Sequence, residues 1–304
     1  MMRKIITLLL FMYITVMNTL IFAQNRMLVF QTDFGMKDGA VSAMKGVAMG
    51  VDSQLQLFDL THDIPPYNIW EAAYRLEQVL PYWPAGTVFV SVVDPGVGTE
   101  RKSVVLKTTS GHFIVTPDNG TLTLVAASMG IEAIREIDEA VNRRKGSEKS
   151  YTFHGRDVYA FTGARLASGI ISFEQVGKAL SNKVVTIPYQ KAEVKGNKII
   201  GTIDILDIQY GNIWTNIPVE TLQKLQVKTG DSLTVKIYKN KIRKYQAVMP
   251  FAETFGAVAE NKPLAYNNSL MRLSFALNQR NFSETFKVYS GHEWTVEIER
   301  KHSR

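Results

Sequence analysis

The chain has 304 residues, of which 45% are hydrophobic and 21% are charged, as is typical of a globular protein. It contains no cysteine, which excludes disulfides, thiolate metal ligands and a cysteine nucleophile. The net charge of +7 includes two short basic clusters, Arg143–Lys145 and Lys239–Lys244, which we interpret as solvated faces. Neither cluster has the interleaved aromatic residues typical of nucleic-acid binding, so we expect no nucleic-acid partner.

The first 23 residues are typical of an export signal. Arg3 and Lys4 form a positive start, Ile5–Phe22 is mostly apolar, and Ala23 places a small residue before a plausible cleavage point. We expect a periplasmic protein whose signal is cleaved near Ala23. The alternative is an uncleaved N-terminal anchor, because the apolar run is close to the minimal spanning length. No membrane contact is expected beyond this segment.

Residues 24–183 alternate strand-like and helix-like patterns, which predicts an α/β domain. Apolar runs predict strands over residues 27–31, 55–60, 87–93, 103–108 and 112–115. Helical spacing predicts helices over residues 38–50, 70–80, 121–128 and 159–168. Several strands end in an acid-bearing loop: Asp33, Asp63, Asp94 and Asp118. Ligands bind beyond the carboxyl ends of the strands in open parallel sheets, so this edge is predicted to be a polar site.

The pattern changes after residue 183. Residues 184–197 are interpreted as a linker, and residues 198–304 alternate apolar and polar residues in short runs separated by glycines. This pattern predicts a smaller all-β, barrel-like C-terminal domain.

The segment Val92–Arg101, VVDPGVGTER, combines a strand end with an acid, a tight turn and a basic residue. Asp94 ends the apolar run, Pro95–Gly98 turn the backbone, and Arg101 follows the acid by seven residues. The arrangement favours a site over a scaffold, although an exposed loop acid paired with a nearby arginine would look the same.

Three other stretches carry candidate residues. Asp33 could accept two hydrogen bonds from vicinal hydroxyls, as acids do for a ribose, or could cap the next helix. His154, in the sequence HGRD, could transfer a proton near neutral pH, or could be a surface histidine. The segment Asp207–Ile217 has a Gly-Asn hairpin signal, which explains Gly211 and Asn212 but not Trp214.

Six motifs occur in the order expected of one family: TDFG, THDIPP, VVDPGVGTER, PDNG, HGRD and the segment GNIWTNI. Together they resemble the S-adenosylmethionine hydroxide adenosyltransferase family, relatives of the fluorinating and chlorinating adenosyl transferases. The resemblance extends from Met27 to about residue 285. It implies an α/β domain followed by a β-barrel-like domain, and a homotrimer with sites between subunits.

The resemblance also implies the reaction and its residues. Water or hydroxide would displace methionine from the ribose 5′ carbon, giving adenosine and L-methionine, with no cofactor and no metal. The catalytic triad would be Asp94, Arg101 and His154. The substrate-binding residues implied by the family motifs are Asp33, Asp207, Asn212, Trp214 and Ser269.

Two features depart from the family pattern. The late motif, roughly NS-x-G-x-LEIA, keeps Asn268 and Ser269 but has Met271 for glycine and Ser274 for glutamate. The export signal would separate the enzyme from S-adenosylmethionine, which is made in the cytoplasm.

Two other functions stay open. The protein could be a non-catalytic nucleoside-binding protein outside the cytoplasm. It could also be a metal-dependent hydrolase, although its acids and histidines fit no compact metal-ligand signature. The ligands would then be Asp33, His62, Asp63, Asp118 and His154.

Overall fold

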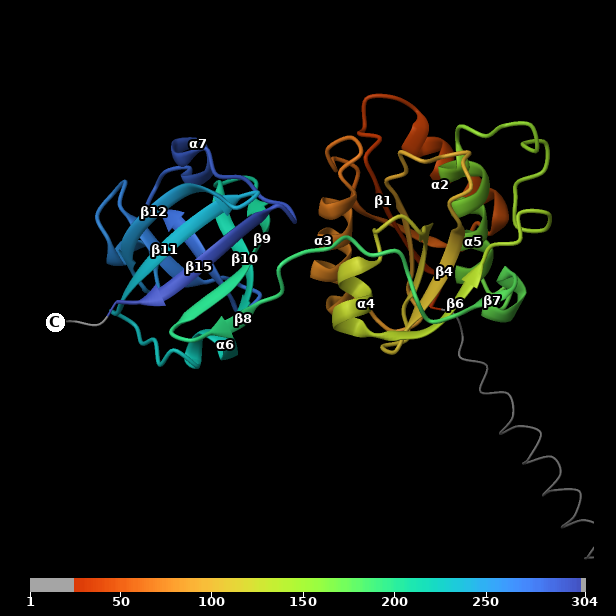
Figure 1. Cartoon of the computed structure of the whole chain (residues 1–304). Coiled ribbons are helices and arrows are strands. Elements are labelled where there is room, and N and C mark those ends of the chain that lie inside the picture. Colours follow the sequence, from red (N-terminus) through yellow and green to blue (C-terminus); the bar gives the residue numbers. More distant parts are fainter. Residues whose placement is uncertain (1–24, 302–304) are drawn as a thin grey trace, which may run out of the picture. The chain divides into compact units, whose positions relative to one another are not determined.

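The computed structural model describes residues 25–301. The expected signal segment and its cleavage point at Ala23 lie outside these residues. The chain divides into two compact units, each with its own sheet (Figure 1). The first unit comprises the chain up to Asn68 and Val79–Val184, and the second comprises Ile69–Gln78 and Val185 onward. Within residues 25–301, no helix has the length and apolar character needed to cross a membrane.

The first unit is built on a seven-stranded sheet in the order β2-β1-β3-β5-β4-β6-β7. Strands β1, β2, β3 and β5 are parallel, and β4, β6 and β7 run antiparallel to their neighbours. The strands are β1 (Met27–Thr32), β2 (Gln56–Thr61), β3 (Val88–Val92), β4 (Ser103–Thr108), β5 (Phe113–Pro117), β6 (Ile131–Glu136) and β7 (Ala179–Leu180). The parallel strands therefore bring Asp33, Asp63, Asp94 and Asp118 to one edge of the sheet.

Helices cover this sheet and bury its apolar strands. They are α2 (Ala40–Val51), η1 (Leu80–Tyr82), α4 (Thr123–Met129), the π-helix η2 (Gly155–Ala160), α5 (Phe161–Ala167) and η3 (Phe173–Val176). Strand β3 is buried along its whole length, and Val90 packs in one cluster with Leu28 and Ala164. Gly163 allows α5 to approach β3 closely, since a Cβ there would lie 2.5 Å from Val90 Cγ2.

The second unit is a barrel-like sheet in the order β12-β11-β15-β9-β10-β14-β13, with β8 on β9. Every pair of strands is antiparallel. An isolated parallel bridge between Phe251, which directly follows β12, and Ala265 of β13 connects the two ends of the sheet. The strands are β8 (Glu193–Lys195), β9 (Lys198–Asp207), β10 (Asn212–Pro218), β11 (Ser232–Lys239), β12 (Ile242–Pro250), β13 (Pro263–Asn267), β14 (Arg272–Leu277) and β15 (Trp294–Arg300). The expected fold class, an α/β domain followed by an all-β barrel-like domain, is confirmed.

Short helices α6 (Val219–Gln223), η4 (Phe255–Ala257) and α7 (Phe282–Phe286) complete the second unit. Two features of this unit were not expected from the sequence. Most of helix α3 (Ile69–Val79) groups with it, and β8 forms within the segment that we interpreted as a linker.

A buried charge cluster lies inside the second unit. Asp204 of β9 is almost fully buried, and Arg272 Nη1 lies 3.4 Å from its Oδ2. Arg272 Nη2 also donates to Glu77 Oε1 of α3 at 2.6 Å. Burial raises the pKa of Asp204 to about 8 and outweighs the opposing effect of Arg272.

This cluster predicts a pH dependence of stability. An aspartate in an unfolded chain titrates near about 4. Between that pH and about 8, the folded protein therefore retains a proton that the unfolded chain has released. Stability is then fully present at low pH and falls as pH rises, by at most about 1.4 kcal/mol per pH unit.

We expect Asp204→Asn to flatten this decline. The measurement is urea unfolding at pH 5 and pH 8, with Glu260→Gln, an exposed acid of the same unit, as the control. An unchanged pH slope in the Asp204 variant would contradict the prediction.

Candidate active site

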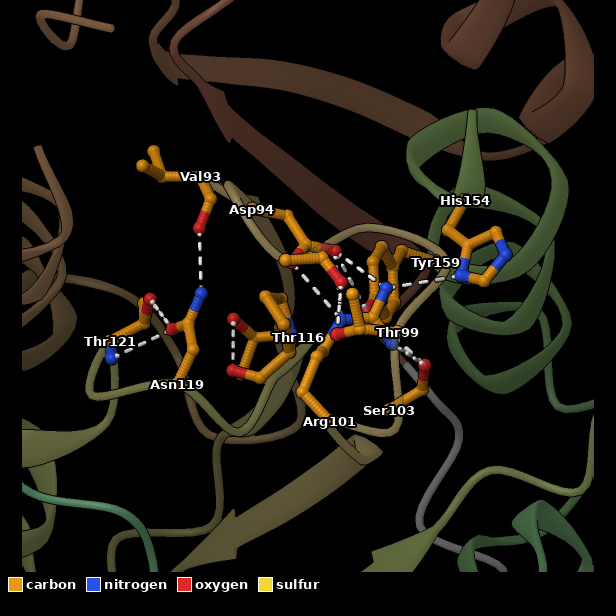
Figure 2. Close-up of polar contacts among 12 residues, drawn as sticks. Val93, Asp94, Thr99, Arg101, Ser103, Thr116, Asn119, Thr121, His154 and Tyr159 are labelled. Atoms are coloured by element: carbon orange, nitrogen blue, oxygen red, sulfur yellow. Dashed lines mark hydrogen bonds and ion pairs between the residues drawn. The ribbon is translucent and has the colours of Figure 1, made fainter. Parts of the chain in front are cut away.

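An acid and an arginine form a tight ion pair just beyond β3. Arg101 Nη2 donates to Asp94 Oδ2 at 2.6 Å, and Arg101 Nε lies 3.0 Å from both carboxylate oxygens (Figure 2). The side chains of Asp94 and Arg101 are only 4% and 11% exposed. The expectation that Arg101 would reach Asp94 is met by the geometry, and the alternative of an exposed loop pair does not hold.

The turn between these residues explains their contact. Val97 N donates to the Asp94 carbonyl, and Gly98 has a φ of +77°, which favours glycine. A Cβ at Gly98 would lie 2.8 Å from the backbone oxygen of Tyr151. On the other side, Asn119 Nδ2 of the PDNG loop holds the Val93 carbonyl at 2.9 Å. The backbone on both sides of Asp94 is thereby fixed.

His154 completes the cluster from a distant part of the sequence. Its Nδ1 lies 3.0 Å from Arg101 Nη2, so Arg101 contacts both the acid and the imidazole. His154 directly precedes the π-helix η2, a rare element that often occurs at functional sites. Gly155 allows close packing, since a Cβ there would lie 3.2 Å from the Phe34 ring. The histidine is buried, which excludes the surface reading.

The hydroxyl groups of Ser103 and Tyr159 contact the Asp94–Arg101 ion pair. Ser103 Oγ accepts from Arg101 Nη1 at 3.1 Å and lies 3.1 Å from Tyr159 Oη. Tyr159 Oη in turn lies 3.5 Å from Asp94 Oδ2. Burial raises the pKa of Tyr159, so it remains a neutral phenol at physiological pH.

The charges of Arg101 and His154 respond to burial in different ways. Burial opposes the Arg101 cation, but its hydrogen bonds to Asp94 and the nearby charges of Asp94 and Glu139 together outweigh this effect and raise its pKa. Burial lowers the pKa of His154, and the Arg101 and Arg143 cations lower it further against the opposing charge of Glu139. The site at neutral pH therefore combines a fixed cation with a neutral imidazole.

Asp94 and His154 line a cavity of about 350 Å³ in the first unit. Asp33 lies on the same cavity, and its Oδ2 accepts from Tyr67 N at 2.9 Å. The alternative reading of Asp33 as a helix cap does not hold, because α2 begins only at Ala40. The cavity thus joins two acids and an imidazole, with Phe34 and Tyr67 as apolar walls that the sequence reading missed.

His62, Asp63 and Asp118 do not join this cavity. Both ring nitrogens of His62 are occupied, Nδ1 at 2.8 Å from Thr32 Oγ1 and Nε2 at 2.9 Å from Asp59 Oδ1. Within residues 25–301, no group of three or more His, Cys, Asp or Glu side chains is placed to hold a metal ion. His62 instead stabilises the loop that carries Asp33.

A second cavity, of about 530 Å³, lies in the second unit beside the β9–β10 hairpin. Asp207 and Asn212 line it, and Asn212 Nδ2 lies 3.3 Å from Asp207 Oδ2. The hairpin reading of Gly211 is correct: its φ is +67°, and a Cβ there would overlap Asn281. Phe255, Arg280 and Asn281 are among the further lining residues that were not predicted from the sequence.

Two expected binding residues do not line this second cavity. Trp214 is half-buried and its Nε1 donates to Tyr266 Oη at 3.3 Å. Ser269 is exposed in the turn between β13 and β14. Met271, which replaces the glycine of the late motif, keeps a φ of +56° in the same turn. A φ in this left-handed region is the conformation that favours glycine.

The chain matches the two domain models of one protein family. The family description "SAM hydroxide adenosyltransferase N-terminal domain" matches residues 28–177, and the corresponding C-terminal domain matches residues 201–295. The chain belongs to this family, as its motifs indicated.

Particular relatives and a solved structure support this membership. A protein from Methanocaldococcus jannaschii named (R)-S-adenosyl-L-methionine hydrolase is 40% identical over 70% of this chain and 74% of its own length. A protein from Actinopolyspora mzabensis named fluorinase is 27% identical over 87% of this chain and 94% of its own. A crystal structure of an uncharacterized conserved protein from Thermotoga maritima has a TM-score of 0.81 and 34% identity, covering 90% of this chain and all of that one.

Proposed function

We propose that the protein hydrolyses S-adenosylmethionine by attack of water or hydroxide at the ribose 5′ carbon. The new C–O bond forms as the C–S bond breaks, so the products are adenosine, L-methionine and one proton. The observation that carries this proposal is the Arg101-bound carboxylate of Asp94, which shares one cavity wall with His154 and Asp33. The name of the 40% identical hydrolase supports the same reaction.

The chemistry needs mainly positioning. A sulfonium is a good leaving group, so the enzyme has to hold a water molecule in line with the C–S bond. Asp94 would orient this water and accept its proton, with Arg101 holding the carboxylate in place. His154, adjacent on the cavity wall, would contact the water from its other side. Asp33 would accept hydrogen bonds from the two ribose hydroxyls.

Asp94 also argues against a halide nucleophile. A carboxylate repels a small anion that it faces, whereas neutral water is not repelled. The chain is also more similar to the hydrolase from M. jannaschii than to the fluorinase from A. mzabensis. We therefore propose water, not fluoride or chloride, as the co-substrate.

By family resemblance, the ends of the substrate would meet residues of the second unit of a neighbouring subunit. Asp207 would hold the methionine amino group, and Asn212 and Trp214 would lie beside the nucleoside. Ser269 belongs to the late motif, which would contact the adenine and methionine ends of the substrate. The cavity that Asp207 and Asn212 line supports the assignments of these two residues. The replacements Met271 and Ser274 bear on which adenosyl substrate is preferred.

We also propose that the protein is a homotrimer with sites between subunits and that it is exported. The trimer rests on the family resemblance, and analytical ultracentrifugation of the purified protein tests it. Export rests on the N-terminal pattern ending at Ala23, and mass determination of the protein from a periplasmic extract tests it.

Product analysis tests the reaction itself. Purified residues 24–304 are incubated with S-adenosylmethionine without halide, with and without a metal chelator, and the products are separated by chromatography. We expect equal amounts of adenosine and methionine and no effect of the chelator. Adenosine binding without turnover would instead support the nucleoside-binding function. Activity that is lost on chelation and restored by a divalent metal would support the metal-dependent hydrolase.

A further inference from the structure

His154 is contacted by a second arginine from the side opposite Arg101. Arg143 Nη2 lies 3.1 Å from His154 Nε2, whereas Arg101 Nη2 lies 3.0 Å from Nδ1. The Arg143 side chain is only 9% exposed. Our interpretation of Arg143 as part of a solvated basic face is therefore wrong, because this residue points into the protein.

The contacts of Arg143 fix its orientation. Its Nη2 also donates to Glu139 Oε2, and its Nη1 donates to the Ser150 carbonyl at 3.1 Å. Glu139 Oε1 in turn lies 3.4 Å from Ser103 Oγ, which accepts from Arg101. Arg101, His154, Arg143, Glu139 and Ser103 thus form a ring of polar contacts that includes the imidazole.

This ring has a consequence for the protonation of His154. Guanidinium groups only donate hydrogen bonds, and they stay charged at all physiological pH values. An imidazolium carries N–H on both nitrogens and could accept from neither arginine. A neutral imidazole has one lone pair and accepts from one of them. The neutral ring is therefore favoured by geometry, because it offers an acceptor to one arginine, and by charge, because both arginine cations disfavour an imidazolium.

We propose that Arg143, oriented by Glu139, is a positioning residue that holds His154 in place and keeps its ring uncharged during turnover. This inference rests on the proposed function. The S-adenosylmethionine sulfonium is a cation, so an imidazolium on the same cavity wall would repel the substrate. A neutral ring removes that repulsion and can still contact the attacking water.

The charged groups that act on His154 come from three segments. Asp94 follows β3, Arg101 precedes β4, and Glu139 and Arg143 follow β6. Among these, Glu139 and Arg143 carry opposite charges and act on the same ring. Removing each charge should therefore move the titration of His154 in opposite directions, which a merely structural role would not produce.

NMR titration of 15N- and 13C-labelled histidine measures this effect without using activity. The chain has five histidines, and His154→Gln identifies the relevant signal. We expect Arg143→Gln to shift the His154 midpoint to higher pH, because a nearby cation is lost. We expect Glu139→Gln to shift it to lower pH, because a nearby anion is lost. Shifts in the same direction, or none, would overturn the proposal.

Steady-state kinetics separate the effect of the Arg143 charge from the effect of its hydrogen-bonding geometry. Arg143→Lys keeps the charge but loses the planar fork, so the His154 midpoint should stay near that of the wild type while kcat falls about tenfold. In Arg143→Gln, the acidic limb of kcat/KM should move to higher pH together with the NMR midpoint. A wild-type kcat in Arg143→Lys would contradict the positioning role.

Two controls make the outcome unambiguous. Lys145→Gln removes an exposed cation from the same loop and should leave both the titration and turnover unchanged. If Arg143→Gln does not fold, Glu139→Gln and Arg143→Lys carry the test. If the wild type does not hydrolyse S-adenosylmethionine, the proposed function fails, whereas the NMR titration still decides whether Arg143 and Glu139 control the charge of His154.

Discussion

Replacement of Asp94 by alanine or asparagine is expected to lower kcat by about a thousandfold and to leave substrate binding nearly unchanged. The carboxylate is the group that would orient the water and accept its proton. Asparagine keeps the size of the side chain but removes this basicity, so the loss should appear in kcat rather than in KM. Steady-state kinetics and calorimetric titration of S-adenosylmethionine measure the two effects.

Asp63→Asn is the matched control for this experiment. Asp63 follows the neighbouring parallel strand β2 at the same edge of the sheet but is exposed and does not line the cavity. We expect wild-type turnover in this variant. A fully active Asp94→Ala enzyme would refute the catalytic assignment, and a loss of activity in Asp63→Asn would point back to the metal-dependent alternative.

Replacement of Arg101 by methionine is expected to affect both activity and stability. It leaves the Asp94 carboxylate, whose side chain is only 4% exposed, without its bidentate partner. Breaking a buried ion pair from one side costs about 3–5 kcal/mol of unfolding free energy. Turnover should fall as well, because Asp94 then loses its ion-pair partner and His154 loses one of its two arginine contacts. Urea unfolding and steady-state kinetics measure these two losses.

The double variant Asp94→Asn with Arg101→Met separates the two effects. A neutral amide needs no cation, so the double variant should recover much of the lost stability but none of the lost turnover. Lys102→Met, at the exposed position next to Arg101, serves as the control and should change neither quantity. A double variant that is as unstable as Arg101→Met alone would show that the arginine acts through contacts other than the ion pair.

The central part of this site was predictable because its signals are local. In this segment a strand ends in an acid, a turn rich in glycine and proline follows, and an arginine comes seven residues after the acid. This order predicts a loop that brings the arginine back to the acid. The acid at each parallel strand end likewise predicted one polar edge of the sheet. His154 lies 53 residues from Arg101. Its place beside that arginine came from the family resemblance, not from spacing.

The rest of the site depends on contacts that sequence patterns do not record. Arg143 sits in a run of three basic residues, which normally indicates exposure, and its contacts with Glu139 and His154 arise only in the folded protein. Strands β6 and β7 were missed because antiparallel additions at a sheet edge are set by long-range pairing. The same is true of the bridge from Phe251 to Ala265 in the barrel-like sheet.

The close approach of Gly98 to Tyr151 limits how the protein could be engineered. Any side chain at position 98 would push apart the loop that carries Asp94 and the segment that leads to His154, so a library aimed at new nucleophiles should leave this glycine intact. Val97 and Thr152 line the cavity that contains Asp94 and His154, but they do not belong to the ring of polar contacts that includes His154. These two positions are where diversity can be introduced without loosening the catalytic geometry.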